Sequence, residues 1–317
     1  MTAYLLRRLG QSVLVVIGLM ILTFGLIHME PGNVARSILG VRATASKIAI
    51  FNHTYGLDQP LYRQFAAYVD QVVHGNFGTS YALQQPVSTL IAQRLPRDLL
   101  LLGISTVLAL VIAIPLGIYQ AVRRNGIGDY AFTGVAFTLY SMPDFFFAIL
   151  LIAVFSVQLH VLPPEAPQAT SVGGILADPR ALILPVLTLA LISVASFSRY
   201  MRSSAIDVLA QDYVRVARAK GMPERLVLAR HVLRNSILPV VTVVGLSFPL
   251  IVAGAVIAEE VFNYPGMGLL LYQAATTHDF PILLGSTLVI GVSTVIGSLA
   301  ADVAYAVLDP RVRYGRG

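Results

Sequence analysis

The sequence contains no cysteine, which excludes disulfide bonds and thiolate metal sites. It has only two lysines, and neither Lys47 nor Lys220 stands in the Gly-Lys-Ser/Thr order that a phosphate-binding loop needs. The six histidines are scattered without the spacing of metal ligands, and no His-Glu-x-x-His or Gly-x-Ser-x-Gly motif occurs. We therefore expect no catalytic residues, no cofactor and no metal on this chain.

The sequence is also poor in charge. Only 12% of its residues are charged, 56% are hydrophobic, and the mean hydropathy is +0.75. Soluble domains are about one quarter charged, because a surface in water needs charge. Half that share indicates that much of this surface faces lipid.

Long uncharged stretches recur along the chain. A helix needs about 20 apolar residues to cross the hydrocarbon layer, with every backbone group bonded inside the segment. We expect an all-α, polytopic membrane protein with six transmembrane helices. They are predicted at residues 9–29, 99–122, 131–157, 181–202, 237–258 and 281–306.

The basic residues gather in alternate loops. Fifteen of the 22 lysines and arginines flank the first span, follow the second span, lie between spans four and five, or follow the last span. This distribution follows the positive-inside rule and places both termini in the cytoplasm. The net charge of +6 is therefore explained by a cytoplasmic membrane, and nucleic-acid binding is not expected.

Residues 30–98 form a long segment that we expect outside the cell. Within it, Leu61, Phe65, Tyr68, Val69 and Val72 recur at helical spacing and predict one amphipathic helix. We divide the chain into residues 1–98, which hold the first span and this external cap, and residues 99–317, which hold a five-helix core.

Proline and an acidic residue interrupt the third span at Ser141-Met-Pro143-Asp144. A proline inside a helix removes a hydrogen bond and kinks it. Asp144 is either a buried carboxylate bonded to a neighbouring helix or, with Ser141 and Pro143, part of the translocation pathway, since a carboxylate avoids lipid. Asp302, near the end of the last span, is expected to cap or pair structurally.

The loop at residues 203–236 is far longer than a connection needs. Ile206, Leu209, Tyr213, Val216 and Ala217 predict one apolar face of a helix. This helix is expected to end with a left-handed glycine at Gly221, and Pro223 suits the first turn of a second helix. Such a hairpin serves either as an amphipathic element on anionic lipid or as a knob that docks into a partner and transmits motion.

Several motifs occur in order along the chain. The loop carries Tyr213-Val-Arg-Val-Ala-Arg-Ala-Lys-Gly221 and His231-Val-Leu-Arg-Asn-Ser-Ile-Leu-Pro239. Elsewhere stand Leu5-Leu-Arg-Arg8, Tyr55-Gly-Leu-Asp-Gln-Pro60, Gly75-Asn-Phe-Gly-Thr-Ser80, Arg94-Leu-Pro96, Ser141-x-Pro143, Glu260-Val-Phe-Asn-Tyr-Pro-Gly266 and Leu308-Asp-Pro-Arg311. Together they resemble the B-type permease subunit of oligopeptide and dipeptide ABC importers, over essentially the whole chain.

The resemblance implies a type I ABC importer permease fold and a set of partners. These are a homologous second permease, one or two cytoplasmic ABC ATPase subunits that bind ATP and Mg²⁺, and an external substrate-binding protein. It also implies that the loop contacts an ATPase. The residues expected at that contact are Ala217, Arg218, Lys220, Gly221, Met222 and Arg225.

Other functions remain open from the residues. A proton-coupled secondary transporter would use Asp144 and Asp302, but such proteins usually show internal repeats, and the long patterned loop would have no purpose. An intramembrane hydrolase would need a catalytic pair at one depth, whereas the acids are isolated. The B-type subfamily carries dipeptides, longer oligopeptides, glutathione and nickel, and we expect peptide here, with nickel second.

Overall fold

The computed structural model describes residues 2–29, 34–40 and 42–308, and within them the side chains of residues 10–11, 13–29, 34–40, 42–247 and 251–297. This part of the chain is helical, and its one β-type contact is an isolated bridge between Thr79 and Pro86. The all-α prediction is therefore confirmed for the described residues.

Five long helices form the body of the molecule. They are α1 (Thr2–Met29), α5 (Val87–Val122), α9 (Pro179–Leu209), α13 (Leu238–Ala253) and α16 (Phe280–Leu308). The shorter helices are α2 (Val34–Leu39), α3 (Ala45–Thr54), α4 (Leu61–Val73), α6 (Ile127–Ser141), α7 (Asp144–Leu151), α8 (Val172–Leu176), α10 (Asp212–Ala219), α11 (Glu224–Val227), α12 (Arg234–Ser236), α14 (Val256–Val261) and α15 (Met267–Thr277). Two π-helical segments, η1 (Ile152–Gln158) and η2 (Leu228–Leu233), extend α7 and α11.

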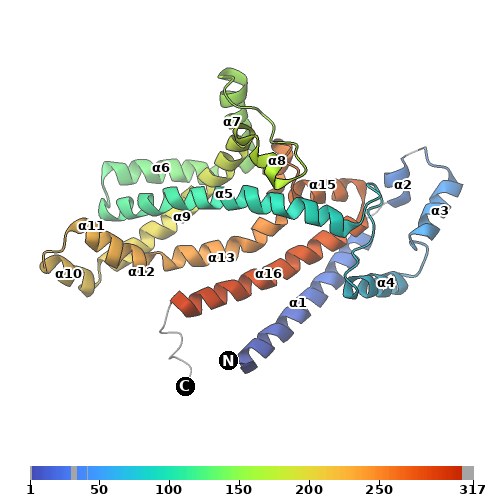
Figure 1. Ribbon diagram of the computed structural model, residues 1–317, viewed down its shortest axis with the longest axis horizontal. Coiled ribbons are helices and arrows are strands. Elements are labelled where there is room, and N and C mark those ends of the chain that lie inside the picture. The colour runs from blue at the N-terminus through green and yellow to red at the C-terminus, as the bar shows by residue number, and fades with distance from the viewer. Residues whose placement is uncertain (1, 30–33, 41, 309–317) are drawn as a thin grey trace.

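The long helices give the molecule an elongated shape (Figure 1). At one end of the long axis lies the hairpin of residues 212–236, built from α10, α11, η2 and α12. At the other end lies the cap, residues 34–86, which contains α2, α3 and α4. The two long loops of the sequence are therefore at opposite ends of one helical bundle.

Helices α5 and α9 form the central pair. The face of α5 that meets α9 carries small side chains four residues apart: Ser105, Ala109, Ala113, Gly117 and Ala121, all buried. At Gly117 a Cβ would lie 2.6 Å from the Cβ of Met201 on α9. Small residues at this spacing allow two helices to approach closely, which is how helices associate when lipid removes the hydrophobic driving force.

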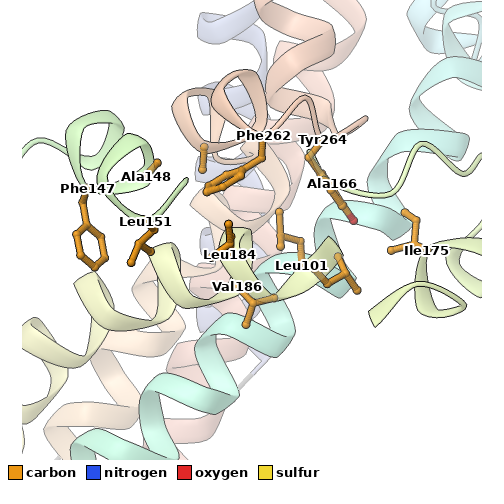
Figure 2. Close-up of a cluster of buried hydrophobic side chains, with 12 residues drawn as sticks. Leu101, Phe147, Ala148, Leu151, Ala166, Ile175, Leu184, Val186, Phe262 and Tyr264 are labelled. Carbon is orange, nitrogen blue, oxygen red and sulfur yellow. The ribbon is translucent and has the colours of Figure 1, made fainter. Parts of the chain in front are cut away.

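The largest buried cluster lies where α5, α7 and α9 meet the connection after α14 (Figure 2). Leu101 of α5 and Leu184 of α9 are buried there beneath Phe262 and Tyr264. Phe147 and Leu151 bring α7 into the same cluster. This packing fixes α7 and the connection between α14 and α15 against the central helix pair.

The third predicted span, residues 131–157, differs most from expectation. It consists of two helical segments, residues 127–141 and 144–158, and the chain bends by 106° between them. Met142 has extended backbone with ψ 132°, as the residue before a proline prefers, and Pro143 then serves as the N-cap of α7. The proline therefore separates two helices, where the sequence predicted one kinked helix.

The bounds of three other spans also change. The second span belongs to α5, which begins at Val87, so the expected division at residue 98 lies inside a helix. The fifth ends at Ala253, because Gly254 has φ +80° and stops α13. The fourth continues to Leu209, beyond the predicted end at residue 202.

The described residues contain three helices long and apolar enough to cross a membrane: residues 87–122, 179–209 and 280–297. Counting each of the two bent helix pairs, 127–158 and 224–253, as one span raises the number to five. A shorter apolar helix covers Val13–Met29. The structure therefore supports several membrane crossings, and the total of six stays a prediction.

Candidate functional site

The turn of the hairpin is built as the sequence predicts. Gly221 has φ +76°, the left-handed conformation that glycine adopts without penalty. Its N–H donates to the carbonyl of Arg218 at 2.9 Å, and the N–H of Met222 donates to the carbonyl of Ala217 at 3.3 Å. These two hydrogen bonds form a Schellman motif, which satisfies the last carbonyls of α10 and turns the chain into α11.

The inside of the hairpin holds a small apolar core. Val214, Ala217 and Val227 are buried there against Val208 and Leu209 of α9. The predicted apolar face is partly wrong, because it joined Ala217 to Tyr213 and Val216, which are exposed. The chain turns between Leu209 and Asp212, so the helical period of α9 does not continue through α10.

An ion pair closes the hairpin across its turn. The guanidinium of Arg218 donates from Nε and Nη2 to the two carboxylate oxygens of Glu224, at 3.1 and 2.6 Å. The hydrogen bond to Glu224 raises the pKa of Arg218 above its usual range. Both side chains are 40% or more exposed, and a pair exposed to this degree contributes about 0–1 kcal/mol. It sets the geometry of the turn more than its stability.

The outer face of the hairpin combines exposed apolar and basic side chains. Tyr213, Val216 and Leu226 are 42%, 51% and 44% exposed. Lys220 and Arg225 are exposed on the same hairpin, on either side of the turn. Apolar side chains beside cations suit an apolar pocket with an acidic rim on another protein. Ala217 lies in the apolar core of the hairpin, so we expect it to support such a contact by packing the hairpin and not by touching the partner.

The expected pathway residues lie at the bend between α6 and α7. Ser141 and Pro143 line an open depression of about 580 Å³ with the rings of Phe145 and Phe146. Asp144, the first residue of α7, is exposed and has no hydrogen bond to a described residue. The interpretation of Asp144 as a buried carboxylate bonded to a neighbouring helix is therefore wrong for the part of the chain that the structure describes. The side chain of Asp302 lies outside the described residues.

Two buried carboxylates that the sequence reasoning missed hold the start of α15. Asp98 Oδ2 of α5 accepts a hydrogen bond from the Met267 N–H at 2.7 Å. Glu259 of α14 accepts from the Leu269 N–H at 2.8 Å and from the Ala255 N–H at 2.6 Å. Anionic groups at a helix N-terminus satisfy free N–H groups and complement the helix dipole. These contacts join α5, α14 and α15 at one point, which we name the carboxylate joint.

Glycines leave room for the carboxylate joint. A Cβ at Gly266 would collide with the carboxylates of Asp98 and Glu259, and one at Gly254 would lie 2.5 Å from Glu259 Oε1. Next to them, Tyr264 donates its hydroxyl hydrogen to the carbonyl of Arg97 at 2.7 Å. The motif at residues 260–266 therefore connects α14 to α15 beside the carboxylate joint.

An ion pair with a buried carboxylate lies at the hairpin end of the bundle. Arg202 of α9 donates to both oxygens of Asp129 on α6, at 2.8 and 2.7 Å. Asp129 also accepts from the Asn125 N–H at 3.0 Å. The pair joins α6 to α9 across 73 residues of sequence, a distance at which no sequence pattern could signal it.

At the cap end, Asp279 anchors the turn that leads into α5. Its carboxylate accepts hydrogen bonds from the Ser80 hydroxyl at 2.6 Å and from the N–H groups of Tyr81 and Ala82 at 3.2 and 3.0 Å. Asp279 and Ser80 are both buried. The polar motif at residues 75–80 thus has a structural partner in Asp279, just before α16.

The described residues hold no group of three or more His, Cys, Asp or Glu side chains that could bind a metal ion. Asp98 and Glu259 hold a helix end in place and lie enclosed in the fold. The described residues therefore offer an exposed hairpin, a bent helix pair and a hydrogen-bonded joint of three helices.

The sequence is similar to known proteins over almost its whole length. Residues 113–314 match the family described as binding-protein-dependent transport system inner membrane component, and residues 1–102 match its N-terminal region. The oligopeptide transport system permease protein AppB of Bacillus subtilis is 39% identical over 316 residues, which cover 99% of this chain and 100% of that protein. A putative peptide permease protein of Brucella ovis is 42% identical over 317 residues, 99% of each chain. The glutathione transport system permease protein GsiC of Salmonella typhimurium is 39% identical over 314 residues, 99% of this chain and 100% of that protein.

Proposed function

Because the chain belongs to the binding-protein-dependent transport system inner membrane component family, we propose that it is a permease subunit that carries peptides across the cytoplasmic membrane with energy from separate ATPase subunits. Relatives that match over their whole length are named as oligopeptide and peptide permeases, which supports a peptide cargo. Glutathione, itself a tripeptide, is the second candidate cargo, because other relatives are named as glutathione permeases.

The hairpin carries the proposal for energy coupling. Its closed Schellman turn and the Arg218–Glu224 pair make a compact projection at one end of the bundle. Tyr213, Val216 and Leu226 on its outer face are 42–51% exposed. We assign this face, with Lys220, Gly221, Met222 and Arg225, to an ATPase subunit that binds ATP and Mg²⁺.

The remaining partners follow from the same assignment. A second, homologous permease completes the pathway, and an external substrate-binding protein delivers the cargo. The bend at Ser141, Pro143 and Asp144 is assigned to the pathway, because its aromatic and polar surface lies open on this chain. Both termini and the hairpin are assigned to the cytoplasm, and the cap to the outside.

Reconstitution tests the proposed function. Proteoliposomes that contain this chain, a homologous permease and the ATPase subunits should take up a labelled tripeptide only when ATP and the binding protein are supplied. Unlabelled peptides should compete with it more strongly than nickel does. Uptake by this chain alone would show a self-sufficient transporter and would overturn the proposal.

A single substitution tests the hairpin. For the Gly221→Asp variant we expect the protein to assemble and ATP hydrolysis to continue, while peptide uptake falls by about tenfold or more. An effect of this size corresponds to the free energies that typically couple two sites. Gly40→Asp is the matched control, because Gly40 also has positive φ, +84°, and open space around it, but lies in the cap. Equal uptake by the two variants would contradict the docking assignment.

A further inference from the structure

A partly open cavity of about 530 Å³ lies between the cap and the adjoining ends of α1 and α16. Four stretches that are distant in sequence line it: the end of α1, residues 54–71, residues 76–81, and the start of α16. Figure 1 shows these elements gathered at the end of the bundle opposite the hairpin. The volume lies within the range of sites for small ligands. The motifs at residues 55–60 and 75–80 both contribute residues to the lining of this cavity.

One wall of the cavity is a fixed aromatic surface. The ring of Phe24 stacks on His28 with centroids 4.1 Å apart, and His28 lies 5.5 Å from Phe280. His28 is held in place, because its Nδ1 bonds the carbonyl of Phe24 at 2.8 Å and its Nε2 bonds Gln64 Oε1 at 3.1 Å. Tyr68 of α4 lies across from Phe24, with centroids 6.2 Å apart. This wall suits a flat or branched apolar group.

The polar groups of the lining favour an anion. Arg63 is the permanently charged residue among the lining side chains, which include no aspartate or glutamate. Its one hydrogen bond within the described chain, from Nη1 to Gln59 Oε1, is long at 3.5 Å. Its other N–H groups are therefore available to a carboxylate, which a guanidinium binds in bidentate geometry.

Two further polar groups of α4 line the same cavity. The hydroxyl of Tyr68 and the amide of Gln71 make no hydrogen bond to any described residue, although both side chains line the cavity. Burial raises the pKa of the Tyr68 phenol to about 12. The hydroxyl therefore keeps its proton at physiological pH and can donate a hydrogen bond to a ligand.

We propose that the cap cavity binds the C-terminal residue of a peptide, its carboxylate on Arg63 and its apolar side chain against Phe24, Tyr68 and Phe280. The identification of the ligand as a peptide rests on the proposed function. The amino terminus is a poor occupant, because its ammonium group would meet a guanidinium and no carboxylate. A fatty acid has the same chemistry of a carboxylate on an apolar body, so the experiment must separate the two.

Binding is measured by calorimetry on the full chain, assembled with its partner subunits in lipid nanodiscs without ATP. N-acetylphenylalanine presents the carboxylate and the ring, whereas phenylalaninamide presents the ring without the carboxylate. We expect N-acetylphenylalanine to bind and phenylalaninamide to bind about tenfold more weakly. A factor of this size corresponds to the free energy of one hydrogen bond to a charged group. Decanoate is the probe for a fatty acid.

Three variants locate the site. Arg63→Gln should weaken N-acetylphenylalanine binding by about tenfold, whereas Lys47→Gln, which removes an exposed cation of α3 outside the cavity, should leave it unchanged. Ala67→Trp should abolish binding, because Ala67 lines the cavity and the indole would fill it. Recovery of each variant in the assembled complex shows that it folds.

The outcomes separate this proposal from the proposed function. No binding by the unchanged complex, equal binding by the Arg63→Gln and Lys47→Gln variants, or displacement of N-acetylphenylalanine by decanoate at lower concentration would each overturn it. Peptide uptake could still occur in all three cases. Binding with the expected pattern in a complex that imports no peptide would contradict the proposed function and leave the carboxylate site in place.

Discussion

At the scale of single residues, the carboxylate joint is the most constrained point of the chain. Asp98 and Glu259 are fully buried, and each accepts a hydrogen bond from the first turn of α15. Buried acceptors of this kind are costly to leave without partners, at about 1–3 kcal/mol each. The geometry of this site therefore depends on the backbone of α15 staying within hydrogen-bond distance of both carboxylates.

The substitution Gly266→Ala tests that constraint. The backbone at Gly266 is extended, with φ −99°, so alanine is allowed there, but its Cβ would collide with both carboxylates. Overpacking of this kind costs about 1–3 kcal/mol. We expect a lower thermal unfolding temperature for the purified protein in detergent.

Gly134→Ala is the control for this prediction. Gly134 lies inside α6 with nothing within 4 Å of an added Cβ, and alanine is favoured over glycine inside a helix by about 1 kcal/mol. We expect no loss of stability for this variant. If both variants unfold at the same temperature, the carboxylate joint is not as closely packed as its geometry indicates.

Single residues also show what sequence can and cannot predict. The left-handed turn at Gly221 was predictable, because glycine after a basic last turn and before proline is a local signal. Asp98 and Glu259 were not, because the N–H groups of α15 that they accept from lie 169 and 10 residues away in the sequence. Asp98 stands beside Arg97 near the start of an apolar run, and nothing local distinguishes it from a surface carboxylate.

At the scale of elements, the central pair α5 and α9 follows from a pattern that the sequence contains. Ser105, Ala109, Ala113, Gly117 and Ala121 repeat every four residues and form the buried face of α5. Hydropathy alone does not reveal this face, because lipid and protein interior are equally apolar. The stripe of small residues indicates which side of the helix meets a neighbour.

The break between α6 and α7 depends on Pro143. The residue before a proline avoids the helical region, and Met142 accordingly has extended backbone. In the Pro143→Ala variant this restriction is absent, so we expect α6 and α7 to join into a straighter helix. Spin labels at Phe132→Cys and Leu150→Cys should then move apart towards the ~27 Å that a straight helix of that length spans.

Pro115→Ala provides the comparison for this experiment. Pro115 lies inside α5, which continues through it, so its replacement should leave the distance between α6 and α7 unchanged. An unchanged distance in the Pro143→Ala variant would instead show that packing of Phe147 and Leu151 into the main core holds the bend. The sequence predicted a kink here but not its size, because tertiary packing determines the angle.

At the scale of the whole molecule, the direction of each crossing can be followed along the chain. Asp129 at the start of α6 pairs with Arg202 near the end of α9, so both lie at the hairpin end. Phe147 of α7 and Leu184 near the start of α9 share the main core, away from that end. The bent pair therefore returns the chain towards the cap end, as one crossing would, although it is not one straight helix.

Whether the bent pair α6 and α7 crosses the membrane determines on which side the hairpin lies. If the bent pair counts as a crossing, the hairpin lies on the side opposite the cap, as charge distribution also predicts. If it were a re-entrant loop, the chain after it would remain on the side where α5 ends, which is opposite the cap. Helix α9 would then cross from there, and the hairpin would lie on the same side as the cap. The two cases differ in which side of the membrane Tyr213 faces.

The absence of cysteine makes the test direct, because each introduced cysteine is the chain's only thiol. Tyr62→Cys in the cap and Tyr213→Cys in the hairpin replace side chains that are 68% and 42% exposed. In intact spheroplasts, a membrane-impermeant maleimide should label Tyr62→Cys at once, and Tyr213→Cys and Thr2→Cys only after permeabilisation. Labelling of Tyr213→Cys from outside would place the hairpin away from any cytoplasmic ATPase, and the proposed coupling would then be wrong.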